Sequence, residues 1–147
     1  MYEKYMIEAL NEAKIALEEG EIPVGAILVY KDEIIVRSHN TRIQDNCVIG
    51  HAEINVIEEA SKIIKNWRLK ECILYVTLLP CPMCSSAINQ SRIKQVVCGT
   101  VPNNSDYSLI YQILNDNNYG SPVKLLTGIL EEECSQILKE FFLKKRN

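Results

Sequence analysis

The sequence is poor in residues that break regular structure, and it has no long apolar run. Its 147 residues include only 6 glycines and 5 prolines, and 47% are hydrophobic, which is typical of an ordinary folded protein and argues against disorder as the main state. A membrane-spanning helix needs roughly 20 apolar residues in succession, and no stretch of the chain approaches that length. Internal repeats and linker-like tracts are also missing, so we expect a single domain over residues 1–147.

The chain also lacks a large excess of charge of either sign. Its formal net charge is −3, which argues against indiscriminate binding to nucleic acid, so an RNA substrate would need a local basic patch. The first segment carries acidic residues from Glu3 onward and resembles neither a signal peptide nor a transit peptide. We therefore expect a cytoplasmic protein without membrane association, whose 6 cysteines are thiols or metal ligands and not disulfides.

Hydrophobic periodicity divides the chain into alternating helices and strands. Apolar residues at helical spacing predict helices in residues 1–20, 51–64, 83–92, 106–116 and 131–146. Apolar and β-branched runs predict strands in residues 24–30, 33–38, 72–78, 94–99 and 122–126, the first two as a hairpin around Lys31 and Asp32. This order predicts an α/β fold of three layers, α/β/α, with a five-stranded mixed sheet.

Two cysteines follow the predicted strand 72–78 without an intervening loop. Cys81 and Cys84 lie three positions apart, so at the start of a helix both sulfurs fall on one side and can bind one ion. Pro82 suits the first helical turn, where no amide donor is lost, and the free N–H groups there favour thiolates. The pair is arranged for a soft divalent metal, for which zinc is the default.

His51 and Glu53 stand at the start of the second predicted helix. Residues two apart on a regular helix are separated by about 200°, so these side chains can serve one site only if the helix points at it end-on. His51, Cys81 and Cys84 would leave the fourth position of a tetrahedral zinc open for water, as in catalytic sites. Glu53 is then placed to take the proton of that water and return it to a leaving group. The combination of H-x-E with P-C-x-x-C is the described signature of zinc nucleobase deaminases.

Other interpretations of these residues remain open. A C-x-x-C pair by itself is often a redox pair or half of a structural zinc site. Cys47 could supply a fourth ligand and close the metal site, although Glu53 would then have no role. His39 is expected to be structural and not a ligand. The cysteines in apolar patterns are expected to be core thiols: Cys72, Cys98 and Cys134.

The sequence resembles a known family over nearly its whole length. The matching segments are EIPVGAILV, SHN, HAEI, LYVTLLPCPMC, SRIKQVVCG and TGILEEECSQILKEFF. They are similar to those of the bacterial tRNA adenosine deaminases of the TadA type, in the cytidine deaminase-like superfamily. The resemblance implies a homodimer that converts the wobble adenosine of a tRNA anticodon to inosine, with one zinc ion (Zn²⁺) in each chain.

The resemblance also implies roles for single residues. It assigns the zinc ion to the same histidine and two cysteines, and the proton shuttle to Glu53. Asn40 looks like a contact to the flipped-out nucleoside. Phe142 and Arg146 look like contacts to the anticodon loop, for which an aromatic face and a guanidinium are suitable.

Three segments depart from the pattern of that family. Residues 47–50 read CVIG where the family usually has DPTA, and Leu79 replaces an acid. After Gly99 the chain has TVPNNSDYS in place of a glycine-rich segment that contains lysine. We expect all three beside the pocket or on substrate-facing loops. The alternatives are therefore a deaminase of a free base or nucleoside, such as guanine, adenosine or cytidine, and, from a different class, a structural zinc protein or an inactive partner subunit.

Overall fold

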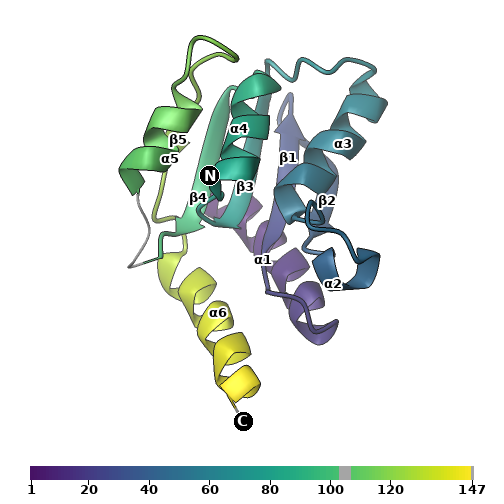
Figure 1. Ribbon diagram of the computed structural model, residues 1–147, viewed down its shortest axis with the longest axis vertical. Coiled ribbons are helices and arrows are strands. Elements are labelled where there is room, and N and C mark those ends of the chain that lie inside the picture. Colours follow the sequence, from purple (N-terminus) through teal and green to yellow (C-terminus); the bar gives the residue numbers. More distant parts are fainter. Residues whose placement is uncertain (103–106, 147) are drawn as a thin grey trace.

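A five-stranded sheet forms the middle layer of the molecule (Figure 1). The computed structural model describes residues 1–102 and 107–146, and the side chain of Arg146 lies outside that description. The strands are β1 Gly25–Tyr30, β2 Glu33–His39, β3 Cys72–Leu78, β4 Gln95–Thr100 and β5 Lys124–Leu126. Their order is β2-β1-β3-β4-β5, in which β1 runs antiparallel to both neighbours and the last three strands run parallel. The predicted mixed sheet is confirmed.

Helices cover both faces of this sheet. They are α1 Tyr2–Glu18, α2 Arg42–Asp45, α3 Ala52–Ile64, α4 Pro82–Gln90, α5 Tyr107–Leu114 and α6 Glu131–Arg146. Helices α1 and α6 pack on one face, whereas α3 and α4 cover the other, with α5 beside α4 (Figure 1). The predicted three-layer arrangement is therefore confirmed. In the part of the chain that the structure describes, no helix combines the length and the apolar character needed to cross a membrane.

Apolar clusters fill the space on either side of the sheet. Leu28 and Leu74 belong to the cluster under α3 and α4, whereas Ile27 and Tyr75 belong to the cluster under α1 and α6. Successive side chains of a strand point to opposite faces, so β1 and β3 are buried on both. Their nearly continuous apolar sequences, which predicted strands, follow from this position in the middle of the sheet.

Two local features fix the start of the sheet. A Cβ atom at Gly25 would overlap the backbone of Ala9 and Ala13, so α1 can lie this close to β1 only because the residue is glycine. In the hairpin turn, Lys31 and Asp32 have positive φ angles of 51° and 64°, as the two central residues of a type I′ turn require. The predicted hairpin is confirmed.

The connection from β2 to α3 contains a helix that hydrophobic periodicity did not predict. Helix α2 has only 4 residues, none of them buried, so it shows no apolar pattern. The N–H of Thr41 donates to the carbonyl of Gly50 at 2.7 Å, which closes residues 41–50 into a compact loop. We call this segment the loop 41–50. Its ends adjoin Asn40 and His51, so the loop borders the predicted metal site.

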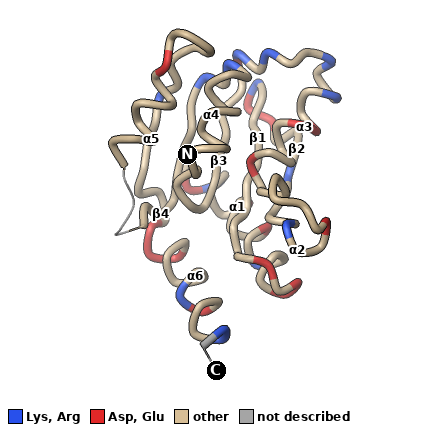
Figure 2. The backbone as a smooth tube through the Cα atoms, in the orientation of Figure 1, with Lys and Arg blue, Asp and Glu red and all other residues tan. Residues whose placement is uncertain are grey.

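Helix α6 carries charges that complement its dipole. Its first turn contains Glu131, Glu132 and Glu133, and Lys144 and Lys145 lie near its end. Figure 2 shows the acidic residues at the start of the helix and the basic residues toward its end. Negative charge near the N-terminus and positive charge near the C-terminus stabilise a helix. The helix extends past the sheet, so its basic end projects from the body of the molecule (Figure 1).

Candidate metal centre

His51, Cys81 and Cys84 come together in the structure, although they lie on separate segments. Their ligand atoms all lie within 4.8 Å of one another. Nδ1 of His51 is 3.7 Å from Sγ of Cys81 and 3.3 Å from Sγ of Cys84. His51 and Cys81 are half-buried, and Cys84 is fully buried. Across residues 1–102 and 107–146, no other group of side chains is arranged to hold a metal ion in this way.

The starts of two helices bring these residues together. His51 is the N-cap of α3 with extended backbone angles (φ −91°, ψ 148°), and Cys81 is the N-cap of α4 (φ −70°, ψ 171°). Cys84 lies in the first turn of α4, which begins at Pro82. Helix α3 therefore meets the site end-on, as the spacing between His51 and Glu53 requires. The site lies at the carboxyl end of β3, where α/β sheets commonly bind their ligands.

The donor set and its spacing fit zinc. Tetrahedral zinc, with Zn–S bonds of about 2.3 Å and Zn–N bonds of about 2.0–2.1 Å, places sulfur and nitrogen roughly 3.5 Å apart. The observed separations of 3.3 and 3.7 Å lie on either side of that value. Two thiolates and an imidazole are also ligand types that suit zinc. Three protein ligands leave one tetrahedral position for water or substrate.

Glu53 lies beside this group in a buried position, and its exposed fraction is 4%. Burial raises the pKa of Glu53 to about 7, and the negative charge of Cys81 adds to the rise, whereas hydrogen bonds from the helix backbone and from Cys84 act in the opposite direction. A carboxyl group with a pKa near neutrality can both accept and donate a proton at physiological pH. Since Glu53 is not one of the three grouped donors, it remains available for proton transfer.

The first turn of α4 stabilises negative charge on the cysteine pair. A hydrogen bond from the Cys84 thiol, helped by the N–H groups of Met83 and Cys84 and by the charge of His51, lowers the pKa of Cys81 to about 5. The same pairing raises the pKa of Cys84, because one proton is shared between the two sulfurs. A bound divalent ion deprotonates a coordinating thiol outright, so both sulfurs would then serve as thiolate ligands.

Asn40, predicted to contact the substrate, lies against the start of α3. Its side chain is 6% exposed, and its Oδ1 accepts a hydrogen bond from the N–H of Ala52 at 2.8 Å. Its Nδ2 makes no hydrogen bond with any described residue, so it is available as a donor. Asn40 also lines a cavity of about 550 Å³ together with Cys47, Val48 and Phe141.

Comparison with known proteins decides the family. Residues 1–100 match the model of the cytidine and deoxycytidylate deaminase zinc-binding region. The tRNA-specific adenosine deaminase of Bacillus subtilis (strain 168) is 44% identical over 145 residues, which cover 98% of this chain and 90% of that protein. The chain belongs to the tRNA-specific adenosine deaminase family. It is therefore a hydrolytic deaminase, and zinc is its cofactor.

Solved structures agree with this family and with the predicted fold. One structure, from studies of A-to-I editing by tRNA deaminases at the wobble position of transfer RNA, matches with a TM-score of 0.84 at 33% identity and covers 91% of this chain and 98% of that chain. The guanine deaminase from Nitrosomonas europaea matches with a TM-score of 0.77 at 18% identity and covers 95% of this chain and 83% of that chain. At this lower identity the likeness extends to the fold alone.

Cys47 does not belong to the metal group of this deaminase. Its side chain is exposed in the loop 41–50, and the grouped donor atoms come from His51, Cys81 and Cys84. A closed structural site with Cys47 as the fourth ligand therefore finds no support in the geometry.

We expect Cys47→Ala to retain about one zinc ion per chain, because an open catalytic site needs only three protein ligands. Metal analysis of the purified variant beside the wild type by mass spectrometry measures this directly. A variant that is purified without zinc would show that Cys47 is a ligand and that the site is closed.

Phe142 and Arg146, which were predicted to contact RNA, lie near the end of α6. Phe142 is 49% exposed, and its ring packs edge-on against that of Phe141, with the ring centroids 5.3 Å apart. The ring of Phe142 is therefore exposed to solvent on one side while it packs against Phe141 on the other. The side chain of Arg146 lies outside the described residues.

The segments that depart from the family pattern lie in different environments. Cys47 and Val48 line the cavity next to Asn40. Leu79 is only 6% exposed and belongs to the apolar cluster under α3 and α4, so the leucine extends the core of the deaminase. In the segment after Gly99, residues 103–106 lie outside the description.

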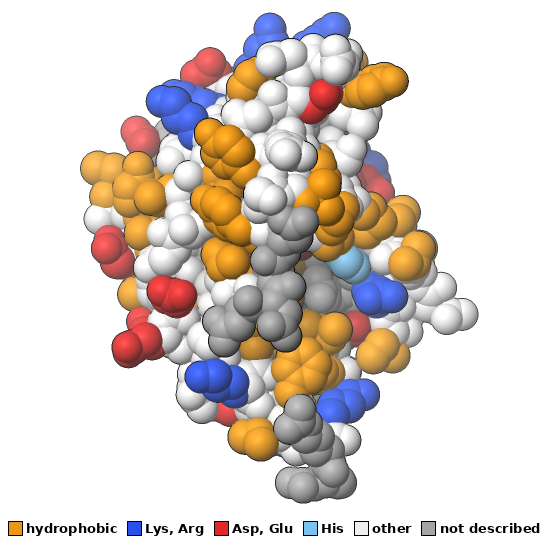
Figure 3. All heavy atoms as spheres, turned by 60° about the vertical axis from the view of Figure 1, so that its left-hand side comes forward, with side chains coloured by type: hydrophobic (Ala, Val, Ile, Leu, Met, Phe, Trp, Pro, Cys, Tyr) orange, Lys and Arg blue, Asp and Glu red, His pale blue; other side chains and the backbone are white. Residues whose placement is uncertain are grey.

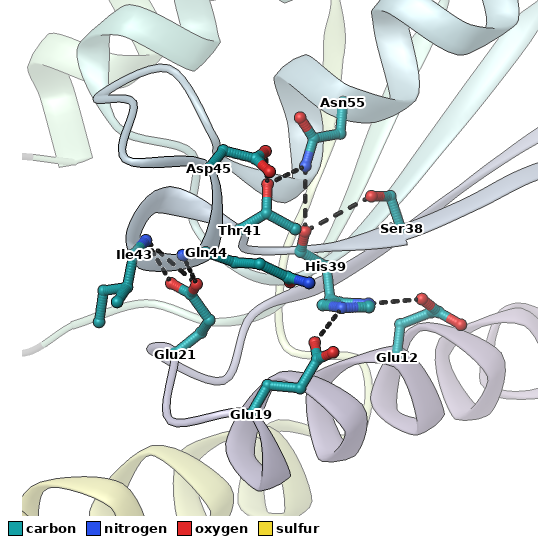
Figure 4. Close-up of polar contacts among 10 residues, drawn as sticks. All are labelled: Glu12, Glu19, Glu21, Ser38, His39, Thr41, Ile43, Gln44, Asp45 and Asn55. Atoms are coloured by element: carbon teal, nitrogen blue, oxygen red, sulfur yellow. Dashed lines mark hydrogen bonds and ion pairs between the residues drawn. The ribbon is translucent and has the colours of Figure 1, made fainter.

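A buried acid that the sequence analysis did not single out anchors the loop 41–50 (Figure 4). Glu21 is 2% exposed, and its carboxylate accepts hydrogen bonds from the N–H groups of Ile43 at 3.1 Å and Gln44 at 2.8 Å. These amides belong to the first turn of α2, which has no side-chain cap of its own. An acid in the short segment between the first helix and a buried strand is the signal that could have drawn attention to Glu21.

A polar residue within α3 holds the same loop from the other side. Asn55 donates from Nδ2 to the carbonyl of His39 at 3.1 Å and to the hydroxyl of Thr41 at 3.0 Å. The hydroxyl of Thr41 in turn donates to Asp45 at 2.7 Å. Figure 4 shows these side chains pointing toward one another from α3 and from the loop. The signal in the sequence is an amide among the apolar positions that follow the H-x-E motif.

Proposed function

We propose that this deaminase converts the wobble adenosine of a tRNA anticodon to inosine. The observation that carries the proposal is a buried carboxyl group, Glu53, beside three zinc donors in a chain whose relatives are named tRNA-specific adenosine deaminases over nearly its whole length. The reaction consumes one water molecule and releases one molecule of ammonia for each adenosine. We assign the metal to His51, Cys81 and Cys84, which supply one nitrogen and two sulfur ligands.

Glu53 moves the protons in the proposed reaction. When bound, zinc lowers the pKa of a water molecule to about 7 and so makes hydroxide available at neutral pH. Glu53 accepts the proton that this water loses. It then returns a proton to the amino group of the purine ring, which leaves as ammonia while oxygen takes its place. A pKa of Glu53 near neutrality suits both transfers.

Asn40 and the end of α6 would bind the RNA. The Oδ1 of Asn40 is held by Ala52, so its Nδ2 has a fixed direction in which to donate to the flipped-out nucleoside. Phe142 offers a ring on which a base of the splayed anticodon loop can stack. Lys144 and Lys145, exposed near the end of α6, supply local positive charge for phosphates in a chain of net charge −3, and Arg146 follows them in the sequence as the proposed contact to the anticodon loop.

A homodimer of single-domain chains in the cytoplasm is part of the proposal. Exposed apolar side chains on α5 support it: Tyr107, Leu109 and Tyr111 are 40%, 42% and 52% exposed. Figure 3 turns the side that carries α5 forward and shows apolar side chains gathered there. Tyr107 and Tyr111 lie one helical turn apart, so their exposed rings share a face that is suited to burial against a second copy.

The proposal is tested with an anticodon stem-loop that carries adenosine at the wobble position. We expect inosine at that position and an equal amount of ammonia, because the RNA contacts present the base to Glu53. A stem-loop with adenosine elsewhere in the loop is the matched control and should stay unmodified. Free guanine, adenosine and cytidine are assayed in parallel. Deamination confined to the free compounds would contradict a tRNA substrate.

A further inference from the structure

His39 lies at the end of β2 between the carboxylate of Glu12 in α1 and that of Glu19, the residue that caps α1 (Figure 4). Its Nδ1 is 2.9 Å from Oε1 of Glu12, and its Nε2 is 2.7 Å from Oε1 of Glu19. The side chains of His39 and Glu12 are 17% and 15% exposed, whereas Glu19 is 37% exposed. The contact with Glu12 is therefore shielded from water, which strengthens an ion pair relative to one at the open surface.

The two contacts require a ring that is protonated on both nitrogens. A neutral imidazole has one N–H, so it can donate to only one carboxylate. Its other nitrogen carries a lone pair, which would be repelled by the lone pairs of the second carboxylate. The imidazolium donates to both. Burial alone would lower the pKa of His39, but the hydrogen bonds and charges of Glu12 and Glu19 outweigh burial and raise the pKa above its usual 6.5.

Among the described residues, Glu12 and Glu19 supply the charged groups that contact the imidazole ring of His39. On the same helix, Glu8 is engaged by Arg37 at 2.6 Å. On the other side of β2, α3 presents the uncharged amide of Asn55, which donates to the carbonyl of His39. The charged residues of α3 beyond its first turn are exposed at the surface: Glu58, Glu59 and Lys62.

The backbone around His39 leads directly to the reaction centre. The next residue, Asn40, accepts a hydrogen bond from the N–H of Ala52 at 2.8 Å, and Ala52 lies between His51 and Glu53. A second connection reaches α3 where Asn55 donates to the carbonyl of His39 at 3.1 Å. Movement of the end of β2 would therefore displace the start of α3.

We propose that protonated His39 is a positioning residue for the reaction centre. By tying α1 to the end of β2, it fixes Asn40, and through Asn40 it fixes the start of α3, which carries His51 and Glu53. The inference rests on the proposed function for its effect on the rate of deamination, whereas its structural part does not depend on the substrate.

The positioning depends on pH in a defined direction. A histidine whose pKa is raised in the folded state contributes stability that is fully present below its unfolded pKa and is lost as the pH rises through the folded value. Above that value one carboxylate faces a bare ring nitrogen, and the tie between α1 and β2 weakens. Deamination therefore declines on the alkaline side, while the zinc ligands stay in place.

The first experiment compares pH profiles of kcat/KM for deamination of the stem-loop. Glu19→Gln keeps a hydrogen-bond acceptor for His39 but removes the negative charge of the carboxylate. The pH at which kcat/KM falls on the alkaline side is therefore expected to decrease by about 1 unit. His39→Gln breaks both contacts and is expected to lower kcat/KM by roughly tenfold, less than the hundredfold that a displacement of about 1 Å can cost.

Arg37→Gln is the matched control, because it removes the other ion pair between α1 and β2 without touching the residue next to Asn40. Its profile should coincide with that of the wild type, and all variants should retain zinc. An alkaline limb at the same pH in Glu19→Gln and the wild type would overturn the proposal.

A second experiment uses NMR and needs no substrate. The chain has only 2 histidines, so the ring signals of His39 can be assigned by comparison with His39→Gln. We expect these signals and the backbone amide of Ala52 to titrate with one midpoint above 6.5, and both midpoints to fall together in Glu19→Gln. An Ala52 amide that stays constant while His39 titrates would overturn the inference. Failure of the stem-loop as a substrate would contradict only the proposed function.

Discussion

Glu53→Gln is expected to eliminate nearly all deamination while the protein keeps its zinc. The amide has the shape of the carboxyl group but cannot accept the proton from water or return it to the leaving amine. Loss of a general acid–base typically costs roughly 10²–10⁴-fold in rate, and a residue that acts in both transfers belongs at the upper end. Ammonia release from the wobble-adenosine stem-loop gives the rate, and metal analysis gives the zinc content.

Glu59→Gln is the matched control for this prediction, because Glu59 lies on the exposed side of the same helix. It should deaminate at the rate of the wild type. Burial disfavours the charged form of Glu53, so Glu53→Gln is also expected to melt no lower than the wild type, which separates loss of chemistry from loss of fold. A Glu53→Gln protein with half the normal rate would contradict the assignment, and one without zinc would make Glu53 a ligand.

Cys84→Ala is expected to remove the zinc and with it all measurable activity. Cys84 is fully buried, and its Sγ is 3.3 Å from Nδ1 of His51, so its removal takes away one of the three grouped donors. Loss of one of three protein ligands should weaken metal binding by more than the roughly 10–100-fold that follows loss of an outer-shell partner. The zinc content of the purified variant and its ammonia release measure the two effects.

Cys72→Ala provides the control, because Cys72 is an equally buried thiol in β3 that belongs to the apolar core. It should keep its zinc and its activity. Circular dichroism is expected to show that Cys84→Ala remains folded, since the core of this chain does not depend on the metal for its size. Normal zinc content in Cys84→Ala would refute the ligand assignment.

The sequence predicted most of the elements and their three layers but not the order of the strands in the sheet. Apolar spacing identified α1, α3 and α6, because each buries one face, and it identified β1 and β3 as continuous apolar runs. Helix α2 has 4 residues and no buried side chain, so it left no periodic signal. The strand order depends on pairings between segments far apart in the chain, and local patterns do not encode such pairings.

The motif residues of the site could be singled out from the sequence, whereas the partners of the residues that support them could not. His51, Cys81 and Cys84 stood out by their spacing, and the structure brings their donor atoms together. Glu21 and His39 form their contacts with partners that lie about 20 to 27 residues away, and such separations carry no periodic signal. An isolated acid or histidine in a sequence gives no indication of which backbone group or carboxylate it will meet.

Apart from the hydroxyl of Thr41, which bonds to Asn55 and Asp45, the loop 41–50 is attached through its backbone groups. Glu21 binds the amides of Ile43 and Gln44, which every residue except proline can supply, and the end of the loop closes through the N–H of Thr41 and the carbonyl of Gly50. Residues 47–49 can therefore change without loosening the loop next to the metal ligands. Three of the four positions at which this chain has CVIG in place of DPTA fall within this range. Substitutions at residues 47–49 are therefore expected to leave Glu53 and the grouped donors of His51, Cys81 and Cys84 in place.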